Sequence, residues 1–149
     1  MAWFRIVTDI TAPIEVCFDL SRSVDLHLES MAASQEQAVG GVTVGLIGDG
    51  EEVSWEARHL GRLWRMTSRI SEFERPHRFV DQMVRGPFAF YRHEHLFEAH
   101  GEGTRMTDVV EVRMGLGPVN PIADRVASTY LRRLMHTRNS HIRTRAEGG

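Results

Sequence analysis

The sequence contains no lysine, and all 18 of its basic residues are arginine. Schiff-base chemistry on a lysine and a phosphate-binding loop built around a lysine are therefore excluded. The single cysteine, Cys17, excludes an intrachain disulfide and a metal site made of several thiolates. Because Cys17 lies between Val16 and Phe18 in a helical pattern, we expect a buried structural thiol rather than a nucleophile.

Long apolar runs are also missing. No segment approaches the roughly 18 apolar residues that a membrane span requires. The N-terminal stretch MAWFRIVTDI lacks the basic and apolar regions of a secretory signal, so we expect a cytoplasmic protein without stable membrane insertion. A net charge of −2 gives no general attraction for nucleic acid. The 149 residues, 42% of them hydrophobic, predict one domain spanning residues 1–149.

Hydrophobic periodicity predicts the order of the elements. Residues 1–10 alternate as in a β-strand, and two short helical patterns follow at 11–21 and 23–31. From residue 35 onward the period changes to two, with glycine-containing turns between the strands. The tight connections predict an antiparallel meander. We expect its strands at residues 36–47, 51–60, 63–73, 78–85, 88–99 and 104–114.

A long helix is predicted at the C-terminal end, with Asn120 as its cap and Pro121 at its first position. Apolar residues recur along it every four positions, and we expect this stripe to pack on the sheet: Ile122, Val126, Tyr130 and Leu134. The helix also carries arginines with few acidic residues, which we expect on a solvated face: Arg125, Arg132, Arg133, Arg138, Arg143 and Arg145.

Two strand registers can be predicted. A two-residue turn at Gly61 and Arg62 would pair His59 with Trp64. By the same turn, Ala57 would face Met66 and Trp55 would face Ser68. A four-residue turn, HGEG, would pair Ala99 with Thr104, Phe97 with Met106 and His95 with Asp108. Directly opposed residues have Cβ atoms within about 5.5 Å, so this register predicts an Asp–His contact in the interior.

The order of elements and four stretches together resemble one family. The stretches are GVTVGLIGDGEEVSWEARHLG, RPHRFVDQMVRGPF, YRHEHLFEAHGEGTRMTDVVE and LRRLMHTRN. They are similar to the START/Bet v 1-like (SRPBCC) superfamily of polyketide cyclase/dehydrase-like proteins, and to its small bacterial branch without assigned activity. The resemblance covers essentially the whole chain. It implies an α+β helix-grip fold, in which a curved antiparallel sheet of about seven strands wraps around a long C-terminal helix.

The same resemblance implies an apolar cavity between the sheet and the long helix. Its ligand would be a lipid, a polyketide, a hormone-like molecule or another small hydrophobic compound. Fold analogy does not separate a carrier from an enzyme.

The stretch YRHEHLF allows four interpretations, because His93 and His95 share the inward side of their strand. In a structural one, Asp108 orients His95 in a buried polar contact. In a binding one, His59, Asp81 and the two histidines orient an apolar ligand. In a chemical one, Asp108 raises the basicity of His95, which acts as a general acid or base. In a metal one, His59 completes a zinc site, but no HExxH motif or cysteine cluster supports it.

We therefore expect a protein that binds a small hydrophobic or amphipathic ligand, acts as a monomer or homodimer and needs no metal or cofactor. One alternative is a cyclase- or dehydratase-like enzyme with a His95–Asp108 proton shuttle. Another is an interaction module that works through the basic helix. The predicted ligand-binding residues are Trp55, His59, Trp64, Met66, Met83, Tyr91, His93, His95, Phe97, Met106, Asp108, Val110, Tyr130 and Leu134.

Overall fold

The computed structural model describes residues 1–115 and 117–148. They form one antiparallel seven-stranded sheet in the order β1-β7-β6-β5-β4-β3-β2. The helices are α1 (Ile14–Ser21), α2 (Val24–Ser30) and α3 (Asn120–Glu147), with 3-10 turns η1 (Ala32–Ser34) and η2 (Gly117–Val119). The strands are β1 (Ala2–Ile10), β2 (Gln37–Gly41), β3 (Glu52–His59), β4 (Arg62–Glu74), β5 (Arg78–Arg85), β6 (Phe90–His100) and β7 (Gly103–Arg113).

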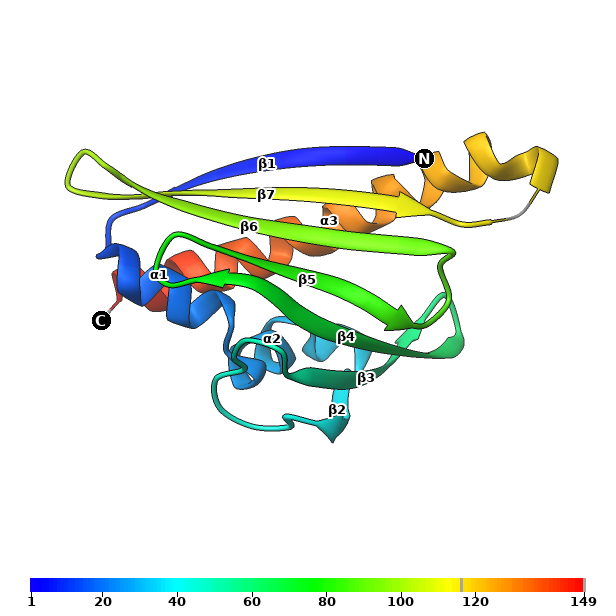
Figure 1. Ribbon diagram of the computed structural model, residues 1–149, viewed down its shortest axis with the longest axis horizontal. Helices are drawn as coiled ribbons and strands as arrows, with labels where there is room; N and C mark the ends of the chain where they lie inside the picture. Colours follow the sequence, from blue (N-terminus) through cyan, green and yellow to red (C-terminus); the bar gives the residue numbers. More distant parts are fainter. Residues whose placement is uncertain (116, 149) are drawn as a thin grey trace.

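The long helix α3 runs along one face of the sheet, and α1 and α2 lie toward one end of it (Figure 1). This arrangement confirms the predicted helix-grip fold, with two short helices after the first strand. No helix in the described ranges has both the length and the apolar run that a bilayer crossing requires.

An aromatic cluster attaches α1 to the sheet. Phe18 of α1 is fully buried, and its ring packs edge-on against three rings of the sheet, those of Phe73, Phe79 and Phe97, with centroids 5.2–5.4 Å apart. Such edge-to-face pairs add about 0.5–1.5 kcal/mol each to the effect of burial. At the same end, Ile142 of α3 is also fully buried. α1 and the C-terminal part of α3 therefore share one buried core with the sheet.

The register of β6 and β7 was predicted correctly. His95 lies opposite Asp108, Phe97 opposite Met106 and Ala99 opposite Thr104. The inward-facing histidines are accordingly buried, with His93 2% exposed and His95 3% exposed.

The predicted register of β3 and β4 was wrong. The two turn residues are Leu60 and Gly61, with φ angles of 55° and 74°. As a result His59 pairs with Arg62, Ala57 with Trp64 and Trp55 with Met66. The turn was predicted one residue too late because leucine rarely adopts positive φ, whereas a tight hairpin turn of this kind requires it at both positions. The pairing shifts by two residues, so the same side chains still face the helix.

The strand predicted at 36–47 is much shorter, because β2 ends at Gly41. This glycine has a φ of 69°, and a Cβ atom there would lie 2.1 Å from the carbonyl oxygen of Glu52. The chain then leaves the sheet as a loop that is fastened to the helical layer. The Gly45 N–H donates to Asp25 at 2.9 Å, and Arg22 donates to the Ile47 carbonyl at 3.2 Å.

The apolar stripe predicted on α3 was also partly wrong. Ile122 and Val126 are 70% and 65% exposed, and the most buried part of the helix lies further along. Its buried face includes Arg138, which had been expected on the solvated side but is only 4% exposed. The buried face contains polar residues, so hydrophobicity alone could not locate it: Asp124, Met135, Arg138, Asn139 and Ile142.

Candidate functional site

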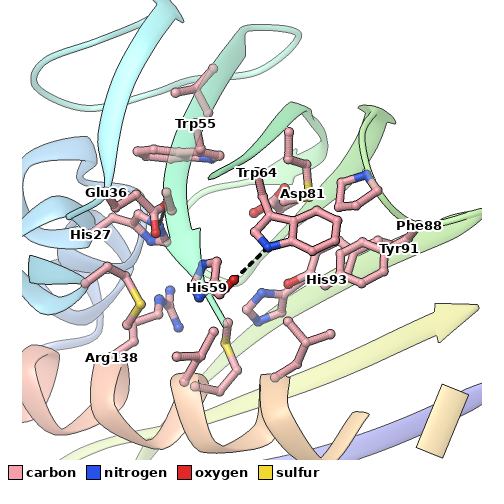
Figure 2. A pocket seen from close by; sticks show the side chains of 18 of the residues that line it. His27, Glu36, Trp55, His59, Trp64, Asp81, Phe88, Tyr91, His93 and Arg138 are labelled. Atoms are coloured by element: carbon pink, nitrogen blue, oxygen red, sulfur yellow. Dashed lines mark hydrogen bonds and ion pairs between the residues drawn. The ribbon is translucent and has the colours of Figure 1, made fainter. Parts of the chain in front are cut away.

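A cavity of about 510 Å³ lies between the sheet and α3. Ligand sites typically measure roughly 300–1,000 Å³ and combine apolar walls with a few polar groups. Side chains from several strands surround it on the side opposite α3 (Figure 2). Most of the wall is apolar or aromatic, including Trp55, Trp64, Met66, Phe79, Phe88, Tyr91, Ala127, Leu131, Leu134 and Met135.

A buried carboxylate, Asp108, lies behind one wall of the cavity. Its oxygens accept hydrogen bonds from His93 Nε2 at 2.7 Å, Asn139 Nδ2 at 2.8 Å and Arg138 Nη1 at 3.3 Å. Burial raises the pKa of Asp108, but the His93 hydrogen bond and the Arg138 charge outweigh it and hold the pKa below its ordinary value. Asp108 is therefore an anion that ties β6, β7 and α3 together.

The guanidinium of Arg138 balances this buried charge. Besides Asp108 it donates to the Asn139 side-chain oxygen at 3.0 Å, the Ser21 carbonyl at 3.2 Å and His95 Nδ1 at 3.3 Å. The Ser21 carbonyl belongs to the last turn of α1, where a cation is favourable for the helix dipole. A buried cation is tolerated only when it is paired and hydrogen-bonded, and these four contacts meet that condition.

His95 is held as a neutral imidazole with one defined tautomer. Its ring stacks between Phe79 and His93, with centroid distances of 4.0 and 3.7 Å. A guanidinium can only donate, so Nδ1 accepts from Arg138 and the proton of the neutral ring lies on Nε2. Burial, then repulsion from His93 and Arg138, lowers the pKa of His95 well below its usual value. Its Nε2 is buried and has no partner among the described residues.

When His95 is replaced with phenylalanine, the free energy of unfolding is expected to fall less steeply as the pH is lowered. Because the folded-state pKa of His95 is depressed, only the unfolded chain takes up this proton just below pH 6.5. The free energy of unfolding therefore falls through this group as the pH is lowered, at a rate that approaches about 1.4 kcal/mol per pH unit once the unfolded histidine is fully protonated. Urea denaturation between pH 7 and 5.5 should give a shallower slope for His95→Phe. The exposed-site control, His136→Phe, should keep the wild-type slope, and equal slopes for all three proteins would contradict a neutral buried His95.

Asp81 brings a second carboxylate to the same place. It lies on β5 directly opposite His93, and its Oδ1 is buried without a hydrogen-bond partner in the part of the chain that the structure describes. One carboxylate oxygen of Asp81 and one ring nitrogen from each of His93 and His95 lie within 4.8 Å of one another. All three residues contribute to the cavity wall.

Two further polar contacts border the cavity. His27 Nε2 lies 2.7 Å from Glu36 Oε1, and the His27 ring packs on Trp55 at 4.2 Å between centroids. His59 Nδ1 lies 2.8 Å from the Tyr130 hydroxyl, which joins β3 to α3. The Trp64 indole N–H donates to the His59 carbonyl at 3.0 Å, drawn as the dashed line in Figure 2. Trp64 and Tyr130 are thus held by hydrogen bonds at their polar ends.

Comparison with known proteins identifies the family. The family model described as polyketide cyclase / dehydrase and lipid transport matches residues 1–147. The chain belongs to this family. The comparison with curated proteins gave no match.

Solved structures show that the family's fold recurs across distant organisms. TTHA0849 from Thermus thermophilus is 16% identical, with a TM-score of 0.72 over 95% of this chain and 97% of that chain. Major latex-like protein 151 from Panax ginseng is 15% identical, with a TM-score of 0.71 over 97% of each chain. A START superfamily protein from Mycobacterium smegmatis is 11% identical, with a TM-score of 0.71 over 94% and 96%. At such identities the likeness establishes the START/Bet v 1-like fold.

In this polyketide cyclase/dehydrase family member, most of the predicted site residues line the cavity: Trp55, His59, Trp64, Met66, Tyr91, His93, His95, Tyr130 and Leu134. The others lie elsewhere. Phe97, Met106 and Val110 are core residues, and Met83 packs against the cluster around Tyr91. Asp108 is fully buried, and its short hydrogen bond goes to His93 rather than to His95, whose Nδ1 is 3.6 Å away.

The sequence reasoning missed several polar residues of the wall, among them His27, Glu36 and Arg138. Arg138 follows Met135 by three positions and precedes Ile142 by four, which places all three on one helical face. This spacing could have predicted from the sequence that Arg138 lies on the buried face of the helix. His27 and Glu36 come from α2 and from the residue before β2, and no pattern in the sequence connects them.

Proposed function

We propose that this protein binds a small hydrophobic or amphipathic ligand, lipid-like or polyketide-like, in the cavity between the sheet and α3. The observation that carries the proposal is the cavity itself, about 510 Å³ in volume and lined mainly by apolar and aromatic side chains. A well-packed domain has few voids larger than a water molecule, so a cavity of this size calls for an occupant.

The family's printed description, with its reference to polyketides and lipid transport, supports the same class of ligand. The polar groups are few and are grouped at separate points of the wall, which suits a molecule that is apolar over most of its length. Aromatic walls provide large contact areas with little loss of side-chain freedom, because hydrogen bonds already hold Trp64 and Tyr130 in place.

The enzymatic alternative, proton transfer by a His95–Asp108 pair, has weaker support. In the tautomer fixed by Arg138, the free nitrogen of His95 carries a proton and acts as a donor. Asp108 is enclosed by donors and accepts hydrogen bonds from His93, Arg138 and Asn139. The pair therefore lacks a free basic atom directed at a ligand, and we favour binding over catalysis.

A fluorescence titration tests the proposal. The probe is 1-aminoanthracene, a neutral aromatic amine whose emission rises in apolar surroundings. We expect saturable binding of one probe per chain, with quenching of the emission of Trp55 and Trp64, which line the cavity. Probe emission that rises without saturating as probe is added, or that saturates only when the protein is unfolded, would contradict a preformed cavity.

A further inference from the structure

Two buried polar atoms of the cavity wall lack partners within residues 1–115 and 117–148: Asp81 Oδ1 and His95 Nε2. A buried polar atom without a hydrogen bond is unfavourable, and nearly all such atoms in folded proteins are paired. One atom is a carboxylate acceptor. The other is a donor, because Arg138 occupies the opposite nitrogen of the ring. The wall thus offers one acceptor and one donor in the same cluster.

The atoms of this cluster suit a hydroxyl group better than a metal ion. The ligand-type atoms of Asp81, His93 and His95 lie within 4.8 Å of one another. Two hydrogen bonds of about 2.8 Å to one oxygen, at an angle of about 120°, span about 4.8 Å. A zinc ion binds only to a ring nitrogen that carries no proton, and the free nitrogen of His95 carries one. A cation would also require the proton of His95 to move to the nitrogen that faces Arg138.

We propose that Asp81 and His95 recognise a hydroxyl group on an otherwise apolar ligand. The Nε2–H of His95 donates to the hydroxyl oxygen, and the hydroxyl proton is donated to Asp81. A hydroxyl group satisfies both atoms because it is at once a donor and an acceptor. This inference rests on the proposed function and adds the class of ligand, an apolar alcohol or phenol.

The same geometry disfavours ligands that end in a carboxylate. Asp81 brings a negative charge to the cluster, and the two arginines that line the cavity are already paired, Arg138 with Asp108 and Arg22 with Asp19. A ligand carboxylate beside Asp81 would place two like charges close together in an apolar cavity. Fatty acids are therefore poor ligands for this end of the cavity, although their chains suit its walls.

Three probes with one skeleton test the inference: naphthalene, 2-naphthol and 2-naphthoate, each displacing 1-aminoanthracene at pH 7. We expect 2-naphthol to bind about tenfold more tightly than naphthalene, which corresponds to two net hydrogen bonds. We expect 2-naphthoate to bind more weakly than naphthalene. In Asp81→Ala the affinities for 2-naphthol and for 2-naphthoate should each come within about twofold of the affinity for naphthalene.

Gln82→Ala is the matched control, since Gln82 is the next residue on β5 and does not line the cavity. It should keep both preferences. Because Asp81 Oδ1 has no partner within the described chain, its removal is expected to leave the fold intact, and Asp81→Asn provides a second variant of nearly the same shape. In Asp81→Asn the discrimination against 2-naphthoate should disappear.

Equal affinities of the wild-type protein for naphthalene and 2-naphthol would overturn the hydroxyl inference and leave the proposed function standing. If 1-aminoanthracene itself showed no saturable binding, so that there was nothing to displace, the proposed function and this inference with it would be contradicted. Stoichiometric Zn²⁺ binding that is lost in Asp81→Ala would overturn the inference as well, because the cation would occupy the place of the hydroxyl group.

Discussion

Replacing Arg138 with methionine is expected to lower the free energy of unfolding by about 3–5 kcal/mol, the usual effect of breaking a buried ion pair. The methionine keeps much of the apolar stem but removes the guanidinium. Asp108 would then be a fully buried carboxylate that has lost its permanently charged partner. Urea denaturation followed by circular dichroism measures the difference.

Arg133→Met is the matched control, because Arg133 lies on the exposed side of the same helix. Its free energy of unfolding should change by no more than about 0.5 kcal/mol. Adding Asp108→Asn to Arg138→Met should recover part of the lost stability, since the second change removes the uncompensated charge. If Arg138→Met were as stable as Arg133→Met, the role of Arg138 in balancing Asp108 would be wrong.

Placing tryptophan at Ala127 is expected to weaken binding of 1-aminoanthracene about 30-fold. Ala127 lies on α3 and lines the cavity, so an indole ring there takes up space that the probe needs. Losing about 80 Å² of apolar contact with the wall corresponds to about 2 kcal/mol, or about 30-fold in affinity. The same fluorescence titration measures the effect.

Thr129→Trp controls for the new indole ring, because Thr129 is exposed two positions further along α3. Its affinity for the probe should equal that of the wild-type protein. Ala127→Trp should retain the wild-type unfolding midpoint within a few degrees, because the ring fills an existing cavity rather than a packed core. Unchanged affinity in Ala127→Trp would mean that the probe binds somewhere else.

Most of the fold could be predicted from the sequence because period-two alternation and tight turns specify an antiparallel meander. The register of β6 and β7 followed from one turn, and it correctly set His95 opposite Asp108. The β3–β4 hairpin was less predictable. Its turn requires Leu60 to adopt a φ of 55°, which the residue type disfavours and the tertiary structure imposes.

The site was only partly predictable, because strand alternation shows which side a residue faces but not how far it lies from the helix. Phe97, Met106 and Val110 face inward, as predicted, yet they pack in the core instead of lining the cavity. Register likewise places His95 opposite Asp108 without fixing the ring orientation. In the structure Arg138 donates to both Asp108 and His95 Nδ1, and the short hydrogen bond of Asp108 goes to His93.

The central claim is that the ligand lies between the sheet and α3, and the methionine methyl groups can test it directly. The chain has seven methionines, four of which line the cavity: Met31, Met66, Met114 and Met135. In methyl-labelled NMR spectra, ring currents from bound 1-aminoanthracene should shift the signals of Met66 and Met135. The signals of Met1 and the core residue Met106 should stay in place. Saturable binding that leaves all four cavity methyl signals unchanged would contradict the account.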